Sequence, residues 1–195
     1  MPPRVVGSPS LRGIFGITGT PGTGKKSVAP MVAGSLGVRC LGLNELAKGA
    51  GLLKGKEGLV DTRLLKKHIA AHLKGPAVVY GHLLPYSLDR GRVTRVAVLR
   101  CEPAVLKRRL ESRGYSAAKV LDNVQAELIG LVSADAYRAF GRAKVFEVDT
   151  TNASAEGAAA VMLSVAEGKG KKAGRIDWMP GYDSGAKLRS LLTSV

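Results

Sequence analysis

The stretch GIFGITGTPGTGKKS, residues 13–27, decides the fold. Its first part, residues 13–18, is a short apolar run that predicts a strand, and residues 19–24 form a glycine-rich turn. Residues 27–36 predict a short helix, with Pro30 either in its first turn or at a kink. The turn and the lysine after it match the first seven positions of the phosphate-loop pattern G-x-x-x-x-G-K-[ST], in the strand-to-helix setting that the pattern requires.

The residue types of this loop suit an anionic ligand. Glycines such as Gly22 and Gly24 let successive backbone N–H groups turn inward around an anion, and the N-terminus of the following helix adds its positive dipole. Lys25 is placed to reach the terminal phosphates. A turn that only joins a strand to a helix is the alternative interpretation, and phosphate binding is the stronger prediction.

The eighth position of the pattern departs from the expected residue. The pattern has a hydroxyl there, which ligates Mg²⁺, but this chain has Lys26, whose ammonium cannot ligate a metal. Ser27 follows and could hydrogen-bond a phosphate, or serve Mg²⁺ if the helix began one residue late. Two interpretations stay open: Lys26 is a surface lysine that the site accommodates, or it is a second cation that partly replaces the charge of the metal.

Apolar runs alternate with helical patterns along the chain, which predicts an α/β fold. Further strands are expected at residues 38–41, 77–80, 95–99 and 145–148, and helices at residues 61–73, 102–112, 117–140 and 155–167. Asp61 is the expected N-cap of the first of these helices. The order is typical of a doubly wound parallel sheet, here with five strands. Residues 42–58 have weak periodicity and predict a mobile insertion with one helical turn at residues 44–48.

The chain is strongly basic. Its 195 residues hold 30 Lys and Arg against 15 Asp and Glu, a formal net charge of +15. The whole excess lies in residues 1–120, because residues 121–195 hold equal numbers of each sign. We therefore expect an anionic partner on the N-terminal two-thirds. A hydrophobic content of 45% excludes a disordered basic tail as the whole protein.

Several patterns bear on the cellular setting. No apolar run approaches the roughly 18 residues of a membrane-spanning helix, and three prolines in the first ten residues predict neither a signal peptide nor an anchor. Cys40 and Cys101 lie far apart, which indicates a reduced, cytoplasmic protein with both thiols buried. Trp178, the only tryptophan, lies in a polar tail and is expected to dock on the domain rather than wait for a partner.

Four further segments, together with the glycine-rich loop, resemble one family. They are YGHL at residues 80–83, RLESRGYS at 109–116, DNVQAE at 122–127 and VDT at 148–150. Together they are similar to the adenylate-kinase isoenzyme 6 family, whose archaeal and eukaryotic members are nucleoside monophosphate kinase folds that act in small-ribosomal-subunit maturation. The resemblance runs from about residue 13 to residue 178. It implies a P-loop nucleoside monophosphate kinase-like fold with two short insertions.

The resemblance implies a role for each matching residue. The residues at the family's ATP-phosphate positions are Gly22, Gly24, Lys25, Lys26, Ser27 and Arg113. Arg113 corresponds to the lid arginine, whose planar guanidinium chelates phosphates, and it joins Lys25 and His82 as the implied catalytic residues. The implied division is a leader at 1–12, a domain at 13–168 and a tail at 169–195. Within the domain, an insertion at about 42–60 would bind the nucleoside monophosphate, and a lid would span about 112–122.

The strand-end signature of that family is incomplete here. His82 matches the histidine of its aspartate-x-histidine signature, which is thought to position the attacking group or water, but Tyr80 stands in place of the aspartate. In P-loop enzymes that carboxylate helps to hold Mg²⁺ through its water shell. Lys26 and Tyr80 thus remove both protein supports of one metal ion. We expect ATP with weakly supported Mg²⁺, no protein metal ligand, and slow phosphoryl transfer.

Three functions are compatible with the sequence. The first is an adenylate kinase (ATP plus AMP to two ADP) with ATPase activity, acting in maturation of the small subunit and its 16S rRNA. The second is a nucleotide-gated ribosome-assembly factor with weak or no turnover. The third, least supported, is a small P-loop kinase acting on a small-molecule hydroxyl. The implied partners are AMP or another nucleoside monophosphate and a small-subunit ribosomal protein or pre-rRNA; a monomer away from membranes is expected.

Ten basic residues lie on or near the elements expected to flank the nucleotide site, and those not needed for phosphates suit an RNA-facing surface. They are Lys66, Lys67, Lys74, Arg90, Arg92, Arg95, Arg100, Lys107, Arg108 and Arg109.

Overall fold

The fold is built on a five-stranded parallel sheet, which confirms the predicted class. The computed structural model describes residues 11–55, 59–170 and 174–193. The strands are β1 (Ile14–Gly19), β2 (Arg39–Gly42), β5 (Ala77–Tyr80), β6 (Val93–Arg100) and β7 (Val145–Asp149). They follow the spatial order β2-β5-β1-β6-β7, and every neighbouring pair is parallel.

The central strand β1 explains why the glycine-rich loop occupies the middle of the sheet. All six of its residues are buried: β5 and β6 pair with its two edges, and helices cover its two faces. Ile17 pairs in register with Tyr80 of β5 and Ala97 of β6. The carboxyl ends of these strands therefore meet at one edge of the sheet, where doubly wound folds bind ligands.

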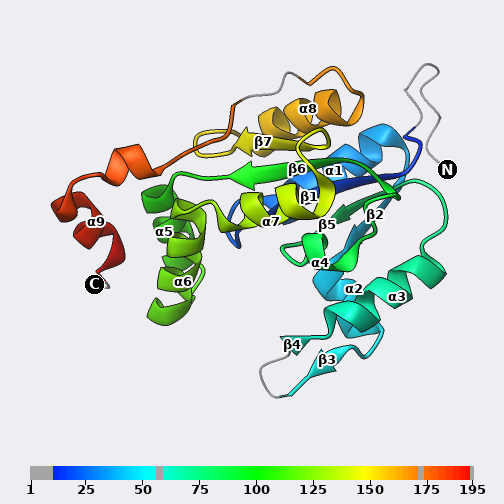
Figure 1. Ribbon diagram of the computed structural model, residues 1–195, viewed down its shortest axis with the longest axis horizontal. Helices are drawn as coiled ribbons and strands as arrows, with labels where there is room; N and C mark the ends of the chain where they lie inside the picture. Colours follow the sequence, from blue (N-terminus) through cyan, green and yellow to red (C-terminus); the bar gives the residue numbers. More distant parts are fainter. Residues whose placement is uncertain (1–10, 56–58, 171–173, 194–195) are drawn as a thin grey trace.

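Helices cover both faces of the sheet (Figure 1). On one face, α1 (Lys25–Leu36) and α8 (Ala155–Ala166) pack against Phe15 and Ile17 of β1. On the other, α3 (Thr62–His72), α4 (Leu84–Ser87) and α7 (Leu131–Phe140) enclose Ile14 and the opposite-facing strand residues. The period-2 alternation of a strand thus supplies two separate cores.

Helix α1 begins two residues earlier than we predicted, at Lys25. Pro30 consequently lies in the second turn rather than the first, on the exposed side of the helix, which continues to Leu36. Gly37, with φ of 64°, ends it. The predicted N-cap of α3 is confirmed, because the side chain of Asp61 accepts hydrogen bonds from the amides of Arg63 and Leu64.

The helical turn predicted at residues 44–48 is present, but the insertion at 42–58 has more regular structure than we expected. The chain forms α2 (Leu43–Gly49) and a two-stranded antiparallel sheet of β3 (Leu53–Lys54) and β4 (Leu59–Val60), with residues 56–58 outside the described part. Leu43 and Ala47, one helical turn apart, are fully buried in the second core. Two apolar anchors were enough to fix a helix whose other residues show little periodicity.

The long helix predicted at 117–140 was wrong, since it is two helices. Gly130, at φ of 67°, separates α6 (Ala117–Leu128) from α7. A left-handed residue ends a helix because it turns the chain out of the helical path, and glycine adopts this conformation at little cost. The break lets α6 leave the sheet and pack on α5 (Pro103–Glu111).

The C-terminal segment lies against α5 and α6, away from the α2 insertion (Figure 1). It contains a 3-10 turn, Met179–Tyr182, and α9 (Gly185–Leu192). Trp178, Leu188 and Leu191 share a third core with α5 and α6, which confirms that Trp178 docks on the domain.

Three remaining expectations have different outcomes. Cys101 is buried as expected, but Cys40 is only half-buried, because β2 is an edge strand with one side uncovered. Residues 1–10, most of the predicted leader, lie outside the described part of the chain. Within the described ranges, no helix is long and apolar enough to cross a membrane.

Candidate active site

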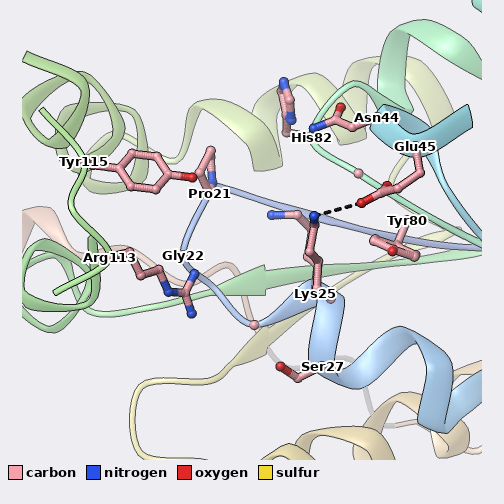
Figure 2. Close-up of a pocket in the computed structure, with 13 residues that line it drawn as sticks. Pro21, Gly22, Lys25, Ser27, Asn44, Glu45, Tyr80, His82, Arg113 and Tyr115 are labelled. Carbon is pink, nitrogen blue, oxygen red and sulfur yellow. Dashed lines mark ion pairs between the residues drawn. The ribbon is translucent and has the colours of Figure 1, made fainter. Parts of the chain in front are cut away.

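A cavity of about 330 Å³ opens at the carboxyl edge of the sheet, beside the glycine-rich loop (Figure 2). Its walls come from the β1–α1 loop, the start of α2, the end of β5 and the segment between α5 and α6. The predicted site residues that line it are Gly22, Gly24, Lys25, Lys26, Ser27, His82 and Arg113. The fold therefore brings together all the site residues that the sequence singled out, from segments up to about ninety residues apart.

The loop backbone has the conformation that a phosphate cradle needs. Gly22 and Gly24 have φ of 95° and 97°, in the left-handed region that glycine favours. A Cβ on Gly22 would lie 2.6 Å from Cδ1 of Leu106, so this position also has no room for a side chain. Helix α1 begins directly after Gly24, so its first turn, with Lys25 and Lys26, supplies helix N-terminal amides in the wall of the cavity.

Lys25 folds back over the loop. Its Nζ donates to the carbonyl oxygens of Gly19 (2.6 Å) and Thr20 (2.9 Å). Burial lowers the pKa of Lys25 to about 7, the charge of Glu127 opposes this change, and nearby Arg113 adds to it. The ammonium is therefore held in a place where it lacks a strong counter-ion, and an anionic ligand would supply one.

The end of β5 contributes an uncharged pair of side chains. Burial, and secondarily the charge of Lys25, lowers the pKa of His82, so its imidazole is neutral near pH 7. Burial also raises the pKa of Tyr80, with a further contribution from the carboxylate of Glu45, so the phenol keeps its proton. A neutral imidazole can accept a proton or orient a hydroxyl group or water.

The side chain of Lys26 has a partner at the edge of the cavity. Its Nζ forms an ion pair with Oε1 of Glu45 at 2.8 Å, drawn as the dashed line in Figure 2. Glu45 lies in the first turn of α2, so the pair joins the helix after the phosphate loop to the insertion. Ser27 lines the cavity as well, but α1 already begins at Lys25, so the late helix start that would put Ser27 at the metal position is absent.

Sequence reasoning missed Asn44 and Glu45, which also line the cavity. They follow β2 with one residue, Leu43, between, and the carboxyl end of β2 lies at the same edge of the sheet as those of β1 and β5. Polar residues just after a parallel strand are the available signal for such positions. That signal went unused because residues 42–58 were interpreted as a mobile insertion.

The donor set does not suit a divalent metal. Hard cations take carboxylate, carbonyl or hydroxyl oxygens, but the two expected positions hold an ammonium at Lys26 and a protonated phenol at Tyr80. Glu45, the one carboxylate among the described residues of the cavity wall, is paired with Lys26 in this structure. Among the described residues, no group of three or more His, Cys, Asp or Glu is arranged to hold a metal ion.

A second cavity, of about 170 Å³, also has Arg113 in its wall. Both cavities are lined by Arg113 and by Gly22 and Gly24 of the phosphate loop. The second is completed by the segment after β7, with Thr150 and Ser154 in its wall. Arg113 is exposed and projects from the α5–α6 connection toward the loop (Figure 2), so its guanidinium is free to bind anions between the two spaces.

A buried ionic network supports the phosphate loop from behind. Oε2 of Glu127 accepts a hydrogen bond from the hydroxyl of Thr20 at 2.5 Å. Oε1 of the same carboxylate accepts from Arg100 Nε (2.7 Å) and Trp178 Nε1 (3.2 Å). Arg100 also pairs with Glu147 at 2.6 Å, and all three charged side chains are at most 1% exposed. Glu127, which ends the DNVQAE segment, therefore ties the loop to the C-terminal tail.

Comparisons with known proteins agree with this site. A family described as "AAA domain" matches residues 16–130. A protein of Thermococcus gammatolerans named "Putative adenylate kinase" is 36% identical over 173 residues, covering 87% of this chain and 95% of that protein. A protein of the same name from Pyrococcus furiosus is 36% identical over 177 residues, covering 87% and 93%.

Two solved structures with the same fold are named as kinases of small molecules. A shikimate kinase from Bacteroides thetaiotaomicron has a TM-score of 0.55 at 17% identity and covers 79% of this chain and 98% of its own. A gluconokinase from Sinorhizobium meliloti has a TM-score of 0.54, also at 17% identity, covering 81% and 93%. At this identity the likeness establishes the fold, and the function is argued from the site.

Proposed function

This chain belongs to the adenylate kinase-like family of P-loop proteins, and from that premise we propose that it transfers the terminal phosphoryl group of ATP to AMP, giving two ADP. Lys25, His82 and Arg113 are proposed as the residues that act on the reacting groups. Gly22, Gly24, Lys26 and Ser27 are proposed to hold the phosphates of ATP.

The observation that carries this proposal is the pair of cavities that share Arg113 and the phosphate loop in their walls. A reaction between two nucleotides needs room for a donor and an acceptor whose phosphates meet at one place. The phosphate loop and Arg113 are shared by the cavities of about 330 and 170 Å³, so both spaces adjoin the same cationic groups. The larger one extends to α2, which supports AMP binding there, and the smaller one suits the nucleoside of ATP.

The chemistry proposed for the site is positioning and charge neutralisation. Phosphoryl transfer spreads negative charge over the oxygens of the moving group, and fixed cations stabilise that charge. The pKa of Lys25 is depressed, so its amine takes up a proton when the phosphates arrive, and the phosphates then serve as its counter-ion. Arg113 offers two parallel N–H donors from the opposite side, and neutral His82 can orient the acceptor.

We also propose the narrower assignment to the isoenzyme 6 family, with a role in small-ribosomal-subunit maturation. The segments at 109–116 and 122–127 support it, and Glu127 of the second segment has a structural task at the phosphate loop. The poor metal support at Lys26 and Tyr80 favours a protein that binds ATP firmly and turns it over slowly. The alternative function is therefore a ribosome-assembly factor with little turnover, in which nucleotide binding controls attachment to a ribosomal protein or pre-rRNA.

The net charge supports an RNA partner less than the sequence suggested, because several arginines serve the fold. Arg92 donates to the carbonyl oxygens of Ile69 and Leu73, and Arg100 lies inside the network with Glu127. Arg95 and Arg109 likewise donate to backbone carbonyls, and Lys66 pairs with Asp89. Of the ten basic residues, the exposed ones are Lys67, Lys74, Arg90 and Arg108.

Binding of a pre-rRNA fragment at increasing salt tests the RNA proposal. Contacts with phosphates release counter-ions, so affinity should fall steeply between about 50 and 200 mM salt. The quadruple variant Lys67→Gln, Lys74→Gln, Arg90→Gln, Arg108→Gln should flatten the slope. Affinity that does not change with salt would refute an RNA-facing surface.

The kinase proposal is tested by ADP formation from ATP with AMP, with other nucleoside monophosphates, and with shikimate or gluconate as acceptors. We expect AMP to be preferred. Arg113→Ala should lower the rate by about 100-fold, since it removes a donor to the transferring group. Arg108→Ala removes another exposed arginine, which lines neither cavity, and should leave the rate unchanged. A sugar-acid acceptor that outperforms AMP would contradict the proposal.

A further inference from the structure

The place where P-loop enzymes support their metal is occupied in this chain by a cation with its own counter-ion. Lys26 is the second residue of α1, at the pattern position of the metal-binding hydroxyl, and its Nζ lies 2.8 Å from Glu45 Oε1. Tyr80, at the other supporting position, lines the same cavity. Two changes from the expected donor set thus coincide at one point, an ammonium and a phenol.

We propose that the ammonium of Lys26 takes the place of the divalent metal, so that the natural ligand of this site is the metal-free nucleoside triphosphate. This inference rests on the proposed function and specifies which form of ATP it uses. Glu45 holds the Lys26 side chain at the cavity while no nucleotide is bound. When the triphosphate enters, Lys26 exchanges the carboxylate for phosphate oxygens.

The exposure of the pair makes this exchange feasible. The side chains of Lys26 and Glu45 are 74% and 52% exposed, and such pairs contribute little because water screens them and the chains stay mobile. A phosphate offers Lys26 more negative charge than one carboxylate and sits among the converging amides of the loop. The competition therefore favours the phosphate when it is present.

The charges around the cavity support the same conclusion. Lys25, Lys26 and Arg113 are cationic when a polyphosphate is bound, Glu45 is the one carboxylate in its wall, and His82 is neutral. The hydrogen bond to Glu45 raises the pKa of Lys26, which keeps the ammonium charged at neutral pH. A divalent cation brought in with ATP would meet Lys26 at close range, and like charges repel. Metal-free ATP meets no such repulsion.

The experiment is calorimetric titration of the full-length protein with ATP in excess EDTA and in excess Mg²⁺. We expect wild-type affinity in EDTA to equal or exceed that in Mg²⁺. Lys26→Thr should weaken binding in EDTA at least tenfold and strengthen it in Mg²⁺. The matched control Lys48→Thr makes the same change at an exposed lysine of α2 that does not line the cavity, and it should change both affinities less than twofold.

Each other outcome overturns a defined statement. Wild-type binding at least tenfold tighter in Mg²⁺ would overturn the inference and leave a metal-dependent kinase intact. Tight binding in EDTA that Lys26→Thr does not weaken would exclude Lys26 as the replacing cation. If Lys26→Thr weakens only the binding of AMP, titrated separately in EDTA, then Lys26 binds the phosphate of the acceptor and not that of ATP, which overturns the inference. Absence of ATP binding in both conditions would instead refute the proposed function.

Discussion

Removal of the Glu127 carboxylate should be among the most damaging single substitutions in this chain. The side chain is 1% exposed and accepts hydrogen bonds from Thr20, Arg100, Trp178 and the amide of Cys101. Breaking a buried ion pair from one side costs about 3–5 kcal/mol, because the remaining charge is left without its partner. Arg100 would keep Glu147 but would lose Glu127, so we expect Glu127→Ala to lie within this range.

The assay is thermal unfolding followed by tryptophan fluorescence. For a domain of this size about 1 kcal/mol corresponds to roughly 2–4 °C, so the midpoint should fall by about 6–20 °C. Trp178 is the only tryptophan and donates to Glu127, so its emission reports directly on docking of the tail. We expect a red shift in Glu127→Ala below the unfolding temperature, together with weaker ATP binding through the lost contact to Thr20.

The control is Glu111→Ala, which removes an exposed carboxylate from α5. It should change stability by no more than about 0.5 kcal/mol, as surface substitutions usually do. A loss below about 1 kcal/mol in Glu127→Ala, with unchanged emission, would refute the view that this residue joins the phosphate loop to the tail.

Three further predictions concern the loop itself. The pKa of Lys25 is about 7 and phosphates would raise it, so ATP binding should take up nearly one proton at pH 8 and almost none well below pH 7. Calorimetry in two buffers of different ionisation enthalpy measures this uptake. Lys25→Arg should abolish it, because arginine stays charged. The double variant Lys26→Thr, Tyr80→Asp should restore metal support and speed the Mg²⁺-dependent reaction about tenfold or more, which is a barrier change of about 1.4 kcal/mol. Equal rates in the variant and the wild type would contradict the view that Lys26 and Tyr80 weaken metal support. Gly22→Ala should cost about 1–3 kcal/mol through its left-handed backbone and the close leucine of α5, whereas Gly34→Ala, with open space around its Cβ, should stabilise α1 by up to about 1 kcal/mol in chemical denaturation.

The sequence predicted the sheet and the phosphate loop because both follow from local patterns. Buried parallel strands are continuous apolar runs, and the loop has a spacing that fixes its backbone. These patterns placed β1 and its neighbours, and they placed Lys25 at the edge of the sheet. His82 and Arg113 were assigned by resemblance, and the fold brings both to the same cavity.

What the sequence did not predict depends on contacts between distant segments. The ion pair of Lys26 with Glu45 forms only because β2 places α2 beside α1. Arg100 counted as a surface charge in the sequence, and only the fold shows it buried between Glu127 and Glu147. The helix break at Gly130 was missed because helical periodicity continues on both sides of it, and its left-handed backbone is visible only in three dimensions.

The most direct test of the proposed function is to trace the terminal phosphoryl group in a single turnover. ATP labelled at the γ-phosphate is mixed with excess protein and unlabelled AMP, in EDTA and in Mg²⁺, and the products are separated by chromatography. The account predicts that the label appears in ADP, with Lys48→Thr behaving as wild type and Arg113→Ala much slower. Label found only in inorganic phosphate, or remaining in ATP, would contradict transfer to AMP.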